Sequence, residues 1–358
     1  MQAQPDRREI RIGGGRKLKV TPVFDTYWRF AAARQEVFAK RVVGKPGPWT
    51  DDPIIARHRF TNAYRASDRV SQYLIRNVIY DGLQDVDEVF FRTLLFKIFN
   101  RVDTWELLTR RLGEQPSWRH FQLAKYERIF DQAMSKGQRL YSAAYIMPSP
   151  PFGKKRKHAN HLQLLDRMMR ERVPMKVATA RSLKSIYDLL LTYPSLGGFL
   201  AFQFTIDLNY SALTDFSEMD FVVAGPGARN GISKCFADTA GLSEAEIIRV
   251  MAERADDEFD RLGLRFQKLG GKRPLQLIDC QNLFCETDKY ARVAHPEITG
   301  GSARTRIKQK FSASAAPLPQ FYPPKWELNG EAKSKRRLAP KSPARARDQL
   351  ALALSPAE

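Results

Sequence analysis

The chain has 358 residues, of which 43% are hydrophobic and 27% are charged, a composition typical of a globular protein with a core of its own. The formal net charge of +20 favours a polyanionic partner, most commonly nucleic acid. No run of about 18 apolar residues occurs and the N-terminal residues are polar, so we expect neither a membrane span nor a signal peptide. The three cysteines form no CxxC pair, which argues against a disulfide framework or a cysteine-rich zinc site and indicates a cytoplasmic protein.

The positive charge is not confined to the C-terminal tail. Residues 301–358 contain 12 Lys and Arg against 4 Asp and Glu, a net charge of +8, which leaves about +12 on the rest of the chain. We therefore expect the body of the protein to attract DNA as well. An anionic membrane or an acidic protein is the alternative partner that charge alone leaves open.

Apolar residues recur at helical spacing along most of the chain. The first such segment covers residues 24–42 and ends at the breaker GKPGP, residues 44–48. Further helices are predicted over residues 62–80, 87–100, 118–134, 161–172, 179–192, 200–209, 243–262 and 275–293. The predicted fold class is therefore all-α.

One helical domain between two basic ends is the predicted organisation. Residues 1–22, with a run of three glycines, are expected to be flexible, and residues 23–297 form the helical domain. Residues 298–358 are rich in Ala, Pro, Ser, Lys and Arg, and we expect this tail to be largely disordered. Its aromatic island FYPPKW, residues 321–326, is a candidate for docking back on the body.

A proline- and glycine-containing turn, YPSLGGFLA at residues 193–201, separates two predicted helices. A tight turn ahead of a helix aims free backbone N–H groups outward, where they and the helix dipole can hold a DNA phosphate. The turn resembles the hairpin of helix-hairpin-helix DNA-binding proteins, with Ser195 in place of the first glycine. This resemblance implies a DNA contact at Ser195, Gly197 and Gly198. An ordinary αα-hairpin is the alternative.

Asp220 follows Gly197 by 23 residues and precedes an apolar run. In this pairing the chain resembles DNA glycosylases of the helix-hairpin-helix class, which carry their catalytic aspartate at a similar spacing. The resemblance implies that Asp220 acts on a nucleotide flipped from the stack, whereas a helix N-cap or a surface acid is the alternative. Phe199 occupies the position of the lysine of lyase-type glycosylases, so no Schiff base is expected there. The glycine-rich segment 224–231 is a further candidate for approaching a phosphate.

Two other segments combine acids, amides and cations at close spacing. They are Asn62, Arg65, Asp68, Arg69 and Gln72, and then Asp279, Gln281, Asn282, Glu286 and Lys289. One helix face is expected to carry most of the first set, while the second interrupts an apolar helix. Such groups suit the binding of a phosphate and a base edge, with Phe60 and Tyr64 available for stacking. Solvated helices with internal salt bridges are the alternative.

Three stretches carry a broader resemblance: residues 48–74 with PWTDDP, FTNAYR and DRVSQYL, residues 215–235, and DCQNLFCE at residues 279–286. In these the chain resembles the helical domain of 5-hydroxymethyluracil DNA kinases, a family also called alpha-glutamyl/putrescinyl thymine pyrophosphorylases. The resemblance extends over residues 23–295. It implies a DNA-glycosylase-like helical domain that takes part in hypermodification of thymine in phage and bacterial DNA.

The sequence departs from a P-loop kinase in one respect. It contains no Gly-x-x-x-x-Gly-Lys-Ser/Thr loop, since residues 44–49 and 270–273 both fail the pattern. The family resemblance implies ATP, but the residues identify no cofactor site. A separate P-loop kinase or another base-modification enzyme is therefore an expected partner beside DNA. His158 and His161 lack a partner carboxylate in the sequence, so no metal site is expected.

The favoured function is phosphoryl or group transfer to an extruded 5-substituted pyrimidine of DNA, in a cytoplasmic, nucleoid-associated protein. Base excision in the manner of a glycosylase and non-catalytic reading of modified DNA are the alternatives. The candidate catalytic residues are Asp220, Asn62, Arg65, Asp68 and Glu286. The candidate DNA-binding residues are Ser195, Gly197, Gly198, Lys154, Lys155, Arg156, Arg69, Gln72, Gln281, Asn282 and Lys289.

Overall fold

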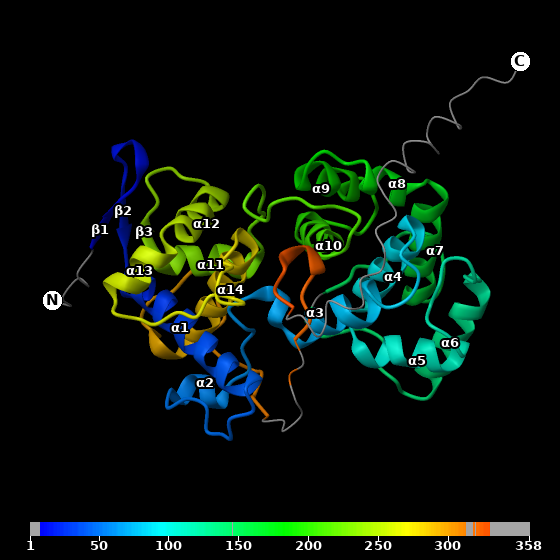
Figure 1. Ribbon diagram of the computed structural model, residues 1–358, viewed down its shortest axis with the longest axis horizontal. Helices are drawn as coiled ribbons and strands as arrows, with labels where there is room; N and C mark the ends of the chain where they lie inside the picture. The colour runs from blue at the N-terminus through cyan, green and yellow to red at the C-terminus, as the bar shows by residue number, and fades with distance from the viewer. Residues whose placement is uncertain (1–7, 145, 313–317, 319, 330–358) are drawn as a thin grey trace, which may run out of the picture.

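The computed structural model describes residues 8–144, 146–312, 318 and 320–329, and these are mostly helical, as the sequence predicts (Figure 1). A small antiparallel sheet has the strand order β1-β2-β3. Its strands are β1 (Glu9–Arg11), β2 (Lys17–Val20) and β3 (Phe236–Asp238). No helix of the described part of the chain is long and apolar enough to cross a membrane.

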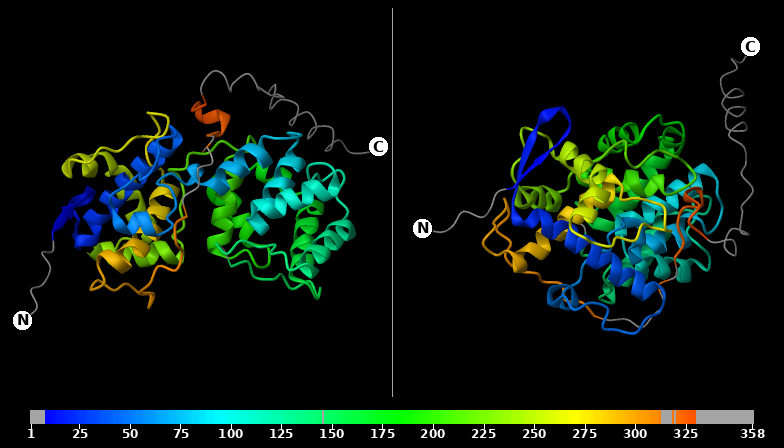
Figure 2. Two further views of the ribbon diagram at one scale, coloured as in Figure 1. Left: turned by 90° about the horizontal axis from the view of Figure 1, so that it is seen from below. Right: turned by 60° about the vertical axis from the view of Figure 1, so that its left-hand side comes forward.

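The helices form two groups, here called lobe 1 and lobe 2, which Figure 2 separates in its left view. Lobe 1 contains the sheet and α1 (Pro22–Val42), α2 (Pro53–Arg57), α11 (Pro226–Cys235), α12 (Glu244–Glu253), α13 (Ala255–Arg261) and α14 (Leu277–Ala294). Lobe 2 contains α3 (Arg69–Tyr73), the π-helical turn η3 (Leu74–Ile79), α4 (Val86–Phe99), α5 (Val102–Leu112), α6 (Leu123–Ser135), α7 (Lys157–Arg170), α8 (Val173–Ala178), α9 (Leu183–Leu191) and α10 (Gly198–Asn209). The short 3-10 turn η2 (Arg65–Ser67) contacts both α14 and α3 and so joins the lobes.

Helix α14 lies at the centre of lobe 1 and packs closely against α11. Two glycines of α11 permit this approach: a Cβ on Gly231 would lie 2.1 Å from the carbonyl oxygen of Phe284, and one on Gly227 would lie 2.3 Å from Cys285 Sγ. The glycine-rich segment that the sequence suggested for phosphate contact thus begins a helix, and these two glycines are required by helix packing.

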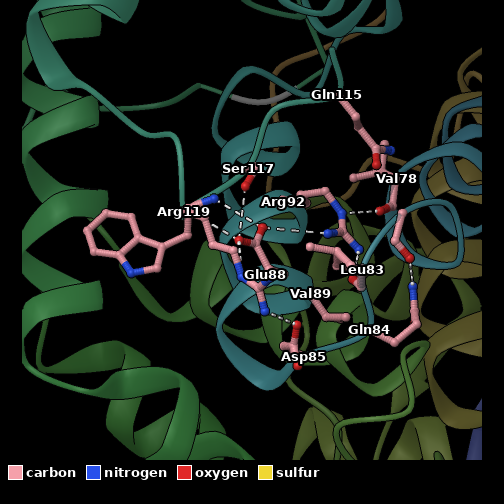
Figure 3. Close-up of polar contacts among 12 residues, drawn as sticks. Val78, Leu83, Gln84, Asp85, Glu88, Val89, Arg92, Gln115, Ser117 and Arg119 are labelled. Carbon is pink, nitrogen blue, oxygen red and sulfur yellow. Dashed lines mark hydrogen bonds and ion pairs between the residues drawn. The ribbon is translucent and has the colours of Figure 1, made fainter.

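Helix α4 is the centre of lobe 2 and carries three buried charged side chains, two of which, Glu88 and Arg92, appear in Figure 3. Arg92 donates hydrogen bonds to the carbonyl oxygens of Val78, Ile79 and Leu83, which satisfies the open C-terminal end of η3. Glu88, one turn earlier, accepts hydrogen bonds from Ser117 Oγ and from the backbone N–H groups of Trp118 and Arg119. The two charges therefore hold neighbouring loops onto the helix.

The structure differs from the sequence prediction in several elements. Helices α2, α5, α8 and α11 were not predicted, and residues 243–262 form two helices, α12 and α13, instead of one. Residues 9–20, expected to be flexible, form β1 and β2, because Ile10, Leu18 and Val20 alternate with charged residues and are buried in the core.

Residues 320–329, here called the C-terminal strap, return to the junction of the lobes. Tyr322 is buried and its hydroxyl lies 3.0 Å from Ser67 Oγ. Lys325 Nζ donates to the carbonyl oxygens of Asn209 (2.6 Å), Ser211 (3.1 Å) and Thr214 (2.5 Å) at the C-terminal end of α10, and burial lowers the pKa of Lys325 to about 8. The aromatic island thus docks on the body, whereas residues 330–358 of the predicted tail lie outside the described residues.

Candidate functional site

Arg65 lies where the two lobes meet. Its backbone N–H donates to Asp279 Oδ1 on α14 of lobe 1, at 2.8 Å. Its guanidinium reaches α10 of lobe 2, where Nη2 pairs with Asp207 Oδ1 at 2.8 Å and Nε donates to Gln203 Oε1 at 3.1 Å. Its Nη1 donates to Tyr210 Oη at 2.9 Å. These five residues, here called the junction cluster, are all buried.

Asp207 receives a second cation from α4. Lys97 Nζ lies 3.0 Å from Asp207 Oδ2, on the side of the carboxylate opposite to its contact with Arg65. Taking these charges out of water costs free energy that only a well-placed counter-ion offsets. The position of α10 is therefore tied both to α4 and to the segment that joins the lobes.

Asp279 adds a protonatable group to the junction cluster. Its carboxylate accepts hydrogen bonds from the N–H groups of Gln276 and Arg65. Burial raises the pKa of Asp279 to about 7, and the nearby carboxylate of Glu218 adds to the rise. Glu218 is itself buried and pairs with Arg273 at 2.7 Å. The guanidinium of Arg273 lies 3.8 Å from the centre of the Trp326 ring, which brings the C-terminal strap to the same place.

Four of the predicted residues meet in a second group, here called the loop cluster, beside the junction. Its members are Asn62, Asp68, Glu286 and Lys289, together with Arg34 of α1. Arg34 Nη2 donates to Asn62 Oδ1 at 2.8 Å, and Asp68 Oδ1 accepts from the N–H of Asn62 at 2.8 Å. Glu286 accepts from the N–H of Thr61 and pairs with Lys289 at 2.8 Å. Burial raises the pKa of Asp68 to about 7.

The prediction that Asn62 to Gln72 share one helix face is wrong. The α-helix begins only at Arg69, because the side chains of Asn62 and Asp68 bond to the backbone and so compete with helix formation. Arg69 is exposed, while Gln72 donates to the carbonyl oxygen of Ala66 and accepts from the N–H of Phe321 in the strap. Asn62 and Asp68 thus bond within the loop before α3, Arg69 faces solvent, and Gln72 contacts the strap.

Gln281 of α14 lies where the N-terminal ends of α10 and α11 approach each other. A Cβ on Gly225, the N-cap of α11, would lie 2.7 Å from the ring of Phe199 in the first turn of α10 and 3.6 Å from Gln281 Nε2. Gln281 is 2% exposed, and its Oε1 has no hydrogen-bond partner among the described residues. A buried acceptor without a donor costs free energy, which a ligand N–H would recover. Asn282 is half-buried on the same helix.

The turn between α9 and α10 contains a residue with positive φ. Ser195, which stands in place of a glycine, has φ +68° and lies in the left-handed region. Gly197 is the N-cap of α10, and a Cβ at this position would meet no atom within 4 Å. A Cβ on Gly198 would lie 3.0 Å from Tyr187 Oη. The start of α10 is therefore exposed at Gly197 and has no side-chain cap.

Asp220 is exposed and lies outside the junction cluster. Its neighbour Phe221 packs against Tyr187 of α9 and Phe202 of α10, at ring-centre distances of 5.1 and 5.9 Å, so Asp220 lies near the α9–α10 turn. Its carbonyl oxygen accepts from Arg249 Nη2 of α12 at 3.4 Å. The acid that enters the junction from this loop is Glu218.

The basic loop of Lys154, Lys155 and Arg156 is exposed, but its charge is partly compensated. Lys154 lies 3.6 Å from Glu127, and Arg156 lies 3.9 Å from Asp131, both on α6. His158 Nε2 also lies 3.2 Å from Asp131 Oδ1. No group of three or more potential metal ligands occurs in the part of the chain that the structure describes.

Sequence reasoning missed Gln203, Asp207 and Lys97. Each is a polar residue inside an apolar helix, α10 or α4, and this is the same signal that drew attention to residues 279–289. Applied to every predicted helix, the signal would have found all three. Their partners would still have been unknown, because Arg65, which binds Gln203 and Asp207, and Lys97, which binds Asp207, are distant from them in sequence.

Residues 21–300 match a family model described as 5-hmdU DNA kinase, helical domain. A curated relative, the 5-hmdU DNA kinase of Bacillus phage SP10, is 25% identical over 291 residues, which cover 75% of this chain and 45% of the relative. The chain thus spans about half the length of this relative. No solved structure matches the chain.

Replacing Asp207 should disrupt the junction. We expect Asp207→Asn to lower the free energy of unfolding by about 3–5 kcal/mol, because Arg65 and Lys97 would be buried without their counter-charge. The control is Asp188→Asn on α9, whose exposed pair with Lys184 should contribute less than about 1 kcal/mol. Urea denaturation of both variants measures the difference, and equal stabilities would contradict the role of the pair.

Proposed function

The chain belongs to the family of 5-hmdU DNA kinase helical domains, and we propose that it binds DNA and takes part in the hypermodification of a thymine-derived base. In this proposal the protein extrudes a 5-substituted pyrimidine and holds it at the junction of the lobes, where the oxygen of its 5-hydroxymethyl group receives a phosphoryl or other activated group and loses its proton. The activity named for the relative, a 5-hmdU DNA kinase, supports the substrate, and the net charge of +20 supports DNA as the partner. The protein would then act in the cytoplasm, at the nucleoid.

The observation that carries the proposal is the environment of Gln281. Its Oε1, which has no hydrogen-bond partner in the described part of the chain, can accept the imide N–H of a uracil-type base, and its amide N–H group can donate to an adjacent carbonyl oxygen of that base. The ring of Phe199 lies beside it, and an aromatic side chain in this position is of the kind that stacks on an extruded base. A base of the thymine type can pair with this amide in two ways, through N3–H with O2 or N3–H with O4, whereas one of the cytosine type offers only its N4 amino group with N3, so we expect the thymine type to be preferred.

We assign no binding site for a phosphoryl donor to this chain. A P-loop binds nucleotide phosphates through its backbone N–H groups and lysine, and the printed sequence contains no such loop. We derive no step through ATP on these residues. In the proposal the chain presents the base, and a separate P-loop kinase or another base-modification enzyme supplies the activated group.

Excision of the base is the second candidate, favoured by the position of Asp220. Its carboxylate is exposed beside the α9–α10 turn, where it could face the sugar of a bound nucleotide. A non-catalytic reader of modified DNA is the remaining candidate. Asn62, Arg65, Asp68 and Glu286, proposed from the sequence as catalytic, have partners within the protein and would act mainly by positioning the junction.

Gln281→Leu should remove the preference for an imide-bearing base. We expect wild-type protein to bind duplex DNA with one 5-hydroxymethyluracil more tightly than the same duplex with 5-hydroxymethylcytosine. In the variant, the ratio of the two affinities should fall about tenfold. Fluorescence anisotropy measures both affinities. Gln132→Leu on exposed α6 is the control and should keep the wild-type preference. A variant that still prefers the uracil-type base would remove Gln281 from the site.

The charge of a side chain introduced at Gly197 should change the affinity for DNA. If the start of α10 contacts a phosphate, Gly197→Glu should weaken duplex binding by about tenfold at low salt, whereas Gly197→Lys, of similar length, should keep or increase the affinity. Both side chains enter open space, so neither should affect folding. Equal effects of the two substitutions would reduce the turn to a structural element.

Mass spectrometry of nucleosides distinguishes the three candidate functions. With a 5-hydroxymethyluracil duplex we expect the base to stay in place with the chain alone, and the nucleoside to gain mass when ATP and a P-loop kinase are both supplied. Asp220→Asn should keep DNA affinity and lower any catalysed change by about 100-fold. Loss of the base would support excision, and unchanged nucleosides under both conditions would support a reader.

A further inference from the structure

The hairpin of β1 and β2 has one apolar and one basic side. Ile10, Leu18 and Val20 are buried with exposed fractions of 5% or less, whereas Arg11, Lys17 and Lys19 between them are exposed. In Figure 1 the hairpin projects from the end of lobe 1. Burial of the apolar side explains why the hairpin forms, but it does not explain why the outer side is cationic.

The hairpin is fixed to the body at its base. Strand β2 pairs with β3, with Val20 opposite Phe236. Arg8 lies within 3.7 Å of carboxylate oxygens of both Asp25 and Glu258, and Arg254 Nη1 donates to the carbonyl oxygen of Arg11 at 3.1 Å. The cations of the outer side are therefore held in place on an ordered element.

Like charges face each other on this outer side. The register places Arg11 directly opposite Lys17, an arrangement that destabilises an antiparallel pair. Glu9 compensates part of this charge by pairing with Lys17 at 2.9 Å. The exposed cations Arg11, Arg16 and Lys19 form no ion pair with any described residue. A bound polyanion would compensate the remaining charge.

The tip of the hairpin is made of Gly13, Gly14 and Gly15. A Cβ on any of them would meet no atom within 4 Å, and Gly14 and Gly15 have φ values of +73° and +74°. A bare backbone at the tip can approach a phosphate more closely than one that carries side chains. Between the tip and α12 lies a cavity of about 300 Å³, whose lining includes Arg16, Arg249 and Arg254 and also Glu246 and Glu253.

The hairpin lies on the same side of the molecule as the proposed phosphate contact. In Figure 1 and in the right view of Figure 2, which share the same vertical direction, β1, β2 and α9 lie at the upper edge of the molecule. Figure 1 shows α12 between the hairpin and α9. Arg249 of α12 contributes to the cavity beside the tip and also donates to Asp220, whose loop packs on α9 and α10. The two features therefore face one side across α12.

We propose that the β1–β2 hairpin is a second DNA contact, which binds the phosphate backbone beside the α9–α10 turn. The proposal rests on the proposed DNA binding and assigns a role to a segment that the function does not otherwise use. The contact is electrostatic and reads no sequence, because its cations pair with phosphates and its tip has no side chains that could reach a base edge. It would hold the duplex in place while one nucleotide is extruded at the junction.

The test compares two variants of the full chain that lose the same charge. The hairpin variant is Arg11→Gln, Arg16→Gln and Lys19→Gln, and the control is Lys125→Gln, Arg128→Gln and Lys136→Gln on and next to α6 of lobe 2, all exposed. Anisotropy with a short duplex between about 50 and 200 mM salt should show a slope of log affinity against log salt that is less negative by about 2–3 in the hairpin variant and by less than about 1 in the control.

A slope equal to wild type in the hairpin variant, or equal losses in both variants, would overturn the proposal. Gly13→Glu and Gly13→Lys provide a second measurement, since Gly13 has open space around it and no positive φ. The first should weaken binding and the second should not, and identical affinities would also overturn it. If wild-type protein itself shows no salt-dependent binding, the proposed function fails. If wild type binds and Gly197→Glu weakens it while the hairpin variants do not, only the hairpin proposal fails.

Discussion

The buried ion pair between Arg65 and Asp207 determines how the two lobes meet. Arg65 is held by its backbone to α14 in lobe 1 and by its side chain to α10 in lobe 2. Because Lys97 completes the charge balance, moving either lobe would leave a buried charge without its partner. The neighbouring contacts, including the approach of Phe199 to Gln281, depend on the lobe arrangement that this pair maintains.

Helix α10 connects the features to which we assign a function. Its N-terminal end is exposed at Gly197, where we propose the phosphate contact, and its first turn places Phe199 beside Gln281. Asp207 near its other end binds Arg65, and Lys325 of the strap closes the C-terminal carbonyl groups. A single rigid helix thus relates the proposed phosphate contact to the proposed base site, which would fix the distance over which a nucleotide is extruded.

The sequence by itself determined the helical class, the family and the local chemistry of several segments. Periodicity is a local property, so helices such as α4, α10 and α14 were predicted close to their observed bounds. The turn before Gly197 was also predictable, because its conformation depends on the few residues that form it. The grouping of Asn62 and Asp68 was expected for the same reason, although the helix expected there was not.

Only the tertiary structure decided which of these segments meet. The local sequence pattern gave no reason to pair Arg65 with Asp207, because the two residues are 142 positions apart, about two-fifths of the sequence. The β1–β2 hairpin was missed because its three apolar positions become a buried side only when lobe 1 is present to cover them. Contacts between residues that are distant in sequence determine which side chains are buried. They therefore also determine whether a charged side chain is exposed to solvent or lies in a candidate site.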